Sequence, residues 1–401
     1  MGSGAALLGA LPPLAKFAAA LALLAVVPWL CRRLGLPQAV LLLGCGVALG
    51  PHGLDLFGEQ RPVAAYFAEL GKLLLMFLAG LQIDLVLLRK LRHRCAAFAL
   101  LTTLLPLTLG VGVALALGYG WLPAIVVGAL IASHTLIGMP IVMRLGATKL
   151  EPVVVAVGST LLSDALALLV LAACVSAFAG GFSWAQLTLQ ALGIVLFVPL
   201  LLLGLAWVTA RLLRAAGDDE ANQFVLLLLA LAVAAQLAQA VKLPDIVGAF
   251  LAGLAVNAAA RGRPATAKLE LVANALFIPA FFFVTGFIVD PLLFVQSAQQ
   301  HLPIAAGITA ALLLGKWLAA QLAGRAFGYS ADARLTVWSL TMPQIAATLA
   351  AALVAFQTRD ASGQRLLDQD MLHAVLVMLV VTSVIGLLLT ERFASRLVRG
   401  G

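Results

Sequence analysis

Charged side chains are scarce in this chain. Asp, Glu, Lys and Arg together make up 10% of its 401 residues, whereas soluble domains contain about 25%. Apolar residues account for 63% of the chain, and the mean hydropathy is +1.10. Apolar stretches of about 18 residues or more, the length that a helix needs to cross a bilayer, recur along the whole sequence. The composition therefore excludes a soluble protein and indicates an integral membrane protein.

Cysteine is also rare, and alternating strand patterns are lacking. The cysteines form no CxxC pair or other metal-ligand spacing, and the five histidines form no HExxH motif. The sequence has no visible nucleophile–base pair, so neither an enzyme nor a cofactor is expected. Without alternating strands a barrel is excluded, and we expect an all-α membrane protein.

Charge clusters and Pro- or Gly-containing turns divide the apolar sequence into about thirteen transmembrane helices. The first apolar run lacks a preceding basic region and a small-residue cleavage pattern, so we interpret it as a retained helix rather than a signal peptide. The loops are short, and no separate soluble domain is expected. The predicted spans are 14–31, 37–50, 65–86, 95–118, 122–144, 153–177, 184–210, 221–241, 244–259, 271–289, 303–325, 334–356 and 371–391.

Lys and Arg are distributed unevenly between the predicted loops. If the N-terminus lies outside, eighteen of them fall in cytoplasmic segments and only Arg61, Lys242, Arg359 and Arg365 in outside loops. This distribution follows the positive-inside rule. It supports thirteen helices, an outside N-terminus and a cytoplasmic C-terminus. The net charge of +8 is thus a topology signal, and no nucleic-acid partner is expected.

Two charged residues fall near the middle of predicted spans, where a charge costs at least ~3 kcal/mol and is by default a functional candidate. Asp164 lies midway along the sixth span and Lys316 midway along the eleventh. A carboxylate binds a proton or a small cation but hardly both together, so one titrating site couples the two flows by competition. Lys316 would balance this charge or, in a structural role, pin helices together. Glu69 and Lys72 lie three residues apart near a helix end and are more consistent with a local ion pair.

Polar residues and proline interrupt two spans at mid-membrane depth. The fifth span contains ASHTLIGMP at 132–140, and the twelfth contains SLTMPQIAAT at 339–348. Each stretch is either a proline kink or a break whose freed carbonyl groups are satisfied by polar neighbours. The two occupy matching places in two five-helix units, helices 2–6 and 9–13, which have inverted topology. Inverted repeats with interrupted helices are typical of secondary transporters.

The order of these elements resembles the monovalent cation:proton antiporter-2 family, which contains bacterial sodium/proton antiporters and glutathione-gated potassium efflux systems. One of the stretches that carry the resemblance reads LPDIVGAFLAGLAVN, and another reads ELGKLLLMFLAGLQID. The matching stretches cover most of the chain in the family's order. They are 32–51, 69–84, 132–171, 243–257, 276–290 and 315–330.

The resemblance implies the sodium/proton antiporter fold and a homodimer in a lipid bilayer, in which a core domain slides against a dimerisation domain in an elevator motion. It places helices 1–3 (1–90) and helices 8–10 (216–300) on the dimerisation side. Helices 4–6 (91–180) and 11–13 (301–401) would form the core, and helix 7 (181–215) would link the two.

The resemblance also assigns site residues. Asp164 matches the family's ion-binding aspartate and would be the ligand of the metal cation, while Lys316 matches a lysine of the sodium/proton branch. Ser163 stands where the electrogenic branch has a second acid, which leaves one titrating acid and implies electroneutral exchange. The nucleotide-binding domain of the potassium efflux systems has no counterpart, so gating by it is not expected. The candidate ion-binding residues are Asp164, Ser163, Ser133, Thr135 and Thr341, with Lys316 as the charge-balancing residue.

These inferences predict a secondary active transporter that exchanges sodium or potassium for protons in a bacterial inner membrane. Two other classes remain open. An ion channel would need no alternating access, and a sodium-coupled organic-anion symporter of the bile-acid type also uses inverted five-helix units.

Overall fold

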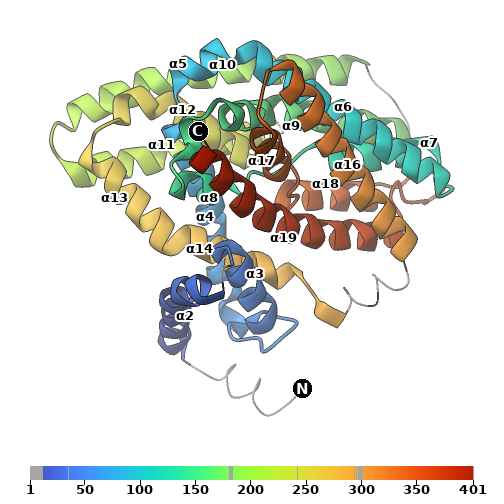
Figure 1. Ribbon diagram of the computed structural model, residues 1–401, viewed down its shortest axis with the longest axis horizontal. Helices are drawn as coiled ribbons and strands as arrows, with labels where there is room; N and C mark the ends of the chain where they lie inside the picture. Colours follow the sequence, from blue (N-terminus) through green and yellow to red (C-terminus); the bar gives the residue numbers. More distant parts are fainter. Residues whose placement is uncertain are drawn as a thin grey trace. The chain divides into compact units, whose positions relative to one another are not determined.

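The computed structural model describes residues 12–34, 36–179, 184–241, 243–292, 294, 296 and 301–400. These residues form helices joined by short loops, without a β-strand among them (Figure 1). An isolated bridge pairs Arg359 with Arg365 in the loop before the last helix. The all-α membrane fold that the composition predicts is confirmed.

Nine helices within the described residues are long and apolar enough to cross a membrane, and each coincides with a predicted span. One of them contains a π-helical turn in its middle. The nine are α2 (Pro13–Leu34), α4 (Arg61–Gln82), α6 (Arg92–Ala116), α9 (Glu151–Phe178), α10 (Trp184–Ala215), α11 (Glu220–Ala240), the run of α13 (Pro264–Val272), η3 (Ala273–Phe277) and α14 (Ile278–Thr285), α16 (Leu302–Ala326) and α19 (Gln369–Gly400).

The other four predicted spans correspond to shorter elements. A helix of 12 residues covers only ~18 Å, less than the ~30 Å of a hydrocarbon core, so the count of thirteen crossings stays a prediction. The shorter elements are α3 (Gln38–Leu49), α7 (Trp121–Ala132) with α8 (Met139–Arg144), α12 (Asp245–Ala260), and α17 (Ala331–Thr341) with α18 (Ala346–Gln357).

The predicted span 65–86 is wrong at its end, because α4 stops at Gln82. The Asp84 carboxylate accepts hydrogen bonds from the backbone N–H groups of Val86 and Leu87, at 2.9 and 3.1 Å. This N-cap starts the separate short helix α5 (Leu85–Lys90). The local side-chain bonds of one aspartate therefore outweigh the apolar pattern that continues past it.

The helices fall into two compact units. Unit 1 contains the predicted helices 1–3 and 8–10, unit 2 contains the predicted helices 4–6 and 11–13, and the boundary cuts α10 after Pro199. The dimerisation and core roles of these groups stay predictions. Lys242, predicted to lie in an outside loop, is outside the described residues. Unit 1 comprises Met1–Leu81, Leu200–Gln239 and Asp245–Leu293, and unit 2 comprises Gln82–Pro199, Ala240–Pro244 and Phe294–Gly401.

Glycines let the helix backbones of unit 1 approach one another closely. A Cβ atom at Gly46 in α3 would lie 1.8 Å from the carbonyl oxygen of Phe283 in α14. A Cβ atom at Gly253 in α12 would lie 2.1 Å from the carbonyl oxygen of Phe77 in α4. Within a bilayer, where lipid tails are as apolar as the side chains, such close backbone packing is a main source of helix association.

In unit 2, helix α6 packs against α7, α9 and α16, and α19 packs against α16 and α17 (Figure 1). A buried apolar cluster fills the space between them and includes Ile131 of α7, Leu312 of α16 and Met378 of α19. This packing holds the helices of Asp164 and Lys316, α9 and α16, in one body with both interrupted spans.

Two glycines of α3 provide a matched test of this packing. Gly46→Ala should lower the melting temperature of the detergent-purified protein, because overpacking against a backbone oxygen costs about 1–3 kcal/mol. Gly44→Ala, two residues away, meets nothing within 4 Å and should melt at or slightly above the parent temperature. Equal melting of the two variants would contradict the close contact between α3 and α14.

Candidate functional site

Both polar stretches are true breaks in the helices. Helix α7 ends at Ala132, and residues 133–138 are not helical before α8 begins. Helix α17 ends at Thr341, and residues 342–345 are not helical before α18 begins. Pro140 lies in the first turn of α8, where its missing N–H removes no helical hydrogen bond. Of the two alternatives, the break rather than the kink is confirmed.

The two breaks are hydrogen bonded to each other. The backbone N–H of Thr135 donates to the carbonyl oxygen of Pro343 at 2.9 Å. The Gln344 side-chain amide donates to the carbonyl oxygen of Ser133, and its oxygen accepts from the Thr348 hydroxyl. Backbone groups that leave a helix inside a membrane need such partners. Here each break provides hydrogen-bond partners for backbone groups of the other.

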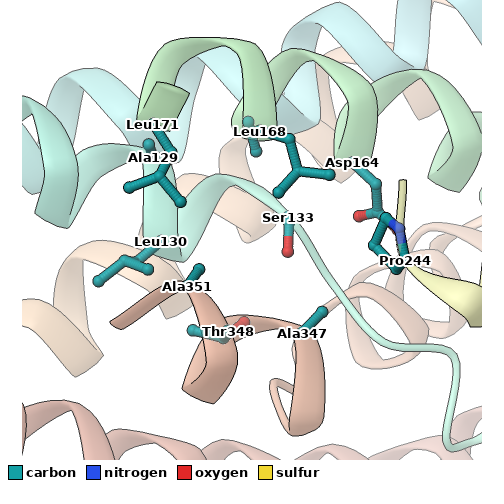
Figure 2. Close-up of a pocket in the computed structure, with 11 residues that line it drawn as sticks. Ala129, Leu130, Ser133, Asp164, Leu168, Leu171, Pro244, Ala347, Thr348 and Ala351 are labelled. Carbon is teal, nitrogen blue, oxygen red and sulfur yellow. The ribbon is translucent and has the colours of Figure 1, made fainter. Parts of the chain in front are cut away.

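The two hydrogen-bonded breaks, residues 133–138 and 342–345, are called the crossing below. Asp164 lies on α9 beside the crossing and is 2% exposed. Neither carboxylate oxygen has a well-aligned hydrogen-bond partner among the described residues. The backbone N–H of His134 and the Lys316 ammonium are near enough to act on it electrostatically. Figure 2 shows Asp164 and Ser133 facing one small pocket, with Thr348 of α18 on the opposite side from α9. The remaining lining residues, among them Leu130, Leu168 and Pro244, are apolar.

Lys316 is completely buried and binds main-chain oxygens. Its ammonium donates to the carbonyl oxygen of Ala132 at 2.5 Å and to that of Thr102 at 3.0 Å. Ala132 is the last residue of α7, so its carbonyl lacks a helical partner and lies at the negative end of the helix dipole. No ion pair within 4.0 Å joins Lys316 to Asp164 among the described residues. The lysine therefore caps a half-helix.

The remaining predicted site residues lie in different surroundings. The Ser163 and Thr341 hydroxyls each donate to a carbonyl oxygen of their own helix at 3.0 Å. The Thr135 hydroxyl is buried without a hydrogen-bond partner among the described residues. The structure thus brings Ser133 and Asp164 into one pocket, leaves the Thr135 oxygen available, and does not place Ser163 or Thr341 in the pocket lining. Their roles in ion binding stay predictions.

Sequence reasoning did not select three polar residues that the structure places at the crossing, namely His134, Gln344 and Thr348. All three lie in or next to the two interrupted stretches. The available signal was their polarity at an apolar depth, because buried polar groups require hydrogen-bond partners. Thr348 bonds to Gln344 four residues earlier, but the partners of His134 and of the Gln344 amide belong to other spans and are not visible from spacing alone.

A lone buried carboxylate beside two hydrogen-bonded helix breaks is typical of secondary transporters. Comparison with known families agrees with this class. The family model described as sodium/hydrogen exchanger, transmembrane, matches residues 20–393. The chain belongs to this family, and it is a multi-pass membrane protein.

Curated relatives support the assignment. The Na(+)/H(+) antiporter NhaS5 of Synechocystis is 40% identical over 385 residues, which cover 96% of this chain and 55% of that protein. The chain thus spans about half the length of this relative. The Na(+)/H(+)-K(+) antiporter GerN of Bacillus cereus is 26% identical, with 88% of this chain and 89% of that protein covered.

The fold also matches a solved structure. The sodium proton antiporter MjNhaP1 from Methanocaldococcus jannaschii superposes with a TM-score of 0.65 and 16% identity, over 96% of this chain and 98% of that chain. At this identity the similarity concerns the fold, so the predicted sodium/proton antiporter fold is confirmed. The family is one of transporters, and it favours neither the channel nor the organic-anion symporter.

Gln344 offers a test of the crossing between the breaks. Its side chain is completely buried, and its own carbonyl oxygen accepts from Ser383 of α19 at 3.0 Å. Gln344→Met keeps the side-chain length but leaves the Ser133 carbonyl without this donor, which costs ~1–3 kcal/mol. We expect a lower melting temperature in detergent. Gln357→Met, at the exposed end of α18, is the control, and a Gln344→Met protein that melts with the parent would show that the amide does not hold the crossing.

Proposed function

We propose that this protein is a secondary active transporter that exchanges a monovalent cation, sodium or potassium, for protons across the membrane. The observation that carries the proposal is the buried Asp164 carboxylate, whose oxygens lack well-aligned partners beside the two helix breaks. In the absence of a tight ion pair, this carboxylate is available to bind a proton or a cation in turn. The names of NhaS5 and GerN support sodium and potassium as the candidate ions.

In the proposed site, the cation is the cargo and Asp164 provides its charged ligand. Ser133 and Thr135 supply further oxygens, as do carbonyl groups of the breaks, and Ser163 and Thr341 complete the predicted set. Hydroxyl and carbonyl oxygens suit hard alkali cations. These groups also allow the cation to leave again, because only one of them carries a formal charge.

The proposed transport cycle is an elevator motion within a homodimer. Support comes from the resemblance and from the location of the site, because Ser133, Asp164, Lys316 and Thr348 all belong to unit 2. A site built within one unit can keep its geometry while that unit moves. Binding of a proton or a cation to Asp164 neutralises the carboxylate, which lowers the cost of carrying it past apolar surfaces.

We further place the protein in the inner (plasma) membrane of a bacterium, with its N-terminus outside and its C-terminus in the cytoplasm. The distribution of Lys and Arg between the predicted loops supports this orientation. The subgroup that we propose is the monovalent cation:proton antiporter-2 family.

The central test is removal of the carboxylate. Asp164→Asn should abolish cation-driven proton flux in proteoliposomes. A carboxamide is not protonated near neutral pH, and without a negative charge it binds a cation more weakly than a carboxylate does. Its folding should be retained, since the side-chain shape is nearly unchanged. The control is Asp218→Asn in an exposed loop, which should transport like the parent. Normal flux through Asp164→Asn would remove the basis of the proposal.

We propose that the exchange is electroneutral, one cation for one proton. The Ser163 hydroxyl does not release its proton at accessible pH, so Asp164 is the one titrating acid among the proposed site residues. The Lys316 charge is held by two carbonyl oxygens, that of Ala132 at the end of α7 and that of Thr102 within α6, and it needs no second carboxylate. The lysine therefore holds the empty site together without being exchanged.

Stoichiometry can be measured with an imposed membrane potential. The transport rate of the parent protein should respond little to the potential, because one positive charge moves in each direction. Lys316→Gln should shift the pH optimum, since it removes the charge that acts on Asp164, and it should leave the stoichiometry unchanged. The readout is proton flux with and without a thiocyanate diffusion potential, which imposes a voltage without a gradient of the transported cation. A strong response of the parent would refute electroneutral exchange.

A further inference from the structure

His134 lies in the first break and contacts the helix of Asp164. Its side chain is 1% exposed, and its Nε2 atom lies 3.0 Å from the hydroxyl oxygen of Thr160. Thr160 is four residues before Asp164 on α9, so the two project from the same helix face one turn apart. Ion-site residues in this chain are otherwise oxygen donors, and an imidazole at this depth requires its own explanation.

The hydrogen-bond geometry around Thr160 bears on the tautomer of the His134 imidazole. The Thr160 hydroxyl lies 3.2 Å from the carbonyl oxygen of Ala156 and 3.0 Å from Nε2 of His134. We assign its proton to the Ala156 carbonyl, which leaves the Thr160 oxygen to accept from the Nε2–H of His134. The Nδ1 atom then carries a lone pair and has no hydrogen-bond partner among the described residues. The ring is buried, and a charged imidazole would be costly there without a charged partner.

His134 also acts on α9 through its main chain. Its backbone N–H is directed to Asp164 closely enough to act on the carboxylate. One residue of the break therefore contacts α9 at two successive turns, through its side chain at Thr160 and through its backbone at Asp164. Its sequence neighbours are Ser133 and Thr135, the proposed oxygen donors. The position of these donors relative to the carboxylate thus depends on how His134 is held.

We propose that His134 is a positioning residue of the exchange site. The hydrogen bond from its Nε2–H to Thr160 fixes the non-helical residues 133–138 against α9, so that the Ser133 and Thr135 oxygens stay within reach of a cation on Asp164. His134 acts as a neutral donor and contributes no exchanged proton. This inference rests on the proposed exchange of a cation for a proton, and it adds the residue pair that determines cation affinity.

The experiment measures the Michaelis constant for the cation, the maximal rate and the melting temperature of four single variants. His134→Leu removes the donor, and Thr160→Val removes the acceptor with little change in shape. His134→Gln retains an N–H group at similar reach. Ser159→Ala is the matched control, because Ser159 is the neighbouring buried hydroxyl of α9 and its hydrogen bond goes to the Ala156 carbonyl at 2.7 Å rather than to His134.

We expect His134→Leu and Thr160→Val each to raise the Michaelis constant about three- to tenfold, the usual range for loss of one hydrogen bond, with the maximal rate within about twofold of the parent. The double variant should equal either single variant, because both remove the same bond. His134→Gln should restore most of the affinity, and Ser159→Ala should match the parent.

A purely structural role predicts a different pattern. Lower melting temperatures with an unchanged Michaelis constant, additive effects in the double variant, or a failure of His134→Gln to restore affinity would each overturn the inference. If His134→Leu does not fold, Thr160→Val alone decides, since it leaves the imidazole in place. An absence of exchange in the parent protein would instead refute the proposed function, so the two failures are distinguishable.

Discussion

The absence of water in the bilayer core is the constraint on which the rest of this structure depends. A backbone group that leaves a helix at that depth must find a partner inside the protein. The two breaks meet this requirement together, because Thr135 bonds to Pro343 and Gln344 bonds to Ser133. Either break alone would leave backbone groups without these hydrogen-bond partners, which explains why the polar interruptions occur as a pair.

The same constraint explains the division of labour between the two buried charges. Lys316 binds the carbonyl oxygens of Ala132 and Thr102, so it compensates the negative end of α7 rather than forming a close ion pair with the aspartate. Asp164 is thereby left with oxygens that are free of well-aligned partners. An acid locked in an ion pair would have to break that pair for each ion bound, at a considerable cost in a medium of low polarity.

Hydrogen bonds also connect the site to neighbouring helices, through side chains that we do not assign as ion ligands. Ser383 of α19 bonds to the Gln344 carbonyl, and Thr160 of α9 bonds to His134. These contacts join both breaks to long helices of the same unit. In unit 1 the corresponding role is taken by close backbone packing at Gly46 and Gly253, which requires no polar groups. Close packing at glycine also occurs in unit 2, at Gly128 and Gly315, so what distinguishes unit 2 is the pair of hydrogen-bonded breaks.

The sequence by itself determined the membrane class, the helical fold, the positions of the breaks and the two buried charges, because hydropathy, proline and a charge at membrane depth are local properties. It also carried the resemblance to sodium/proton antiporters, and the comparisons show that the chain belongs to the sodium/hydrogen exchanger family. Only the tertiary structure decided the partners. It placed Lys316 on the end of α7, turned the Thr341 hydroxyl to its own helix, and brought Gln344 and His134 to the crossing. The pairs made by Lys316, Gln344 and His134 join residues 26 to 211 positions apart. Which of many polar groups meet over such separations depends on helix packing, a property of the whole chain that no local pattern contains.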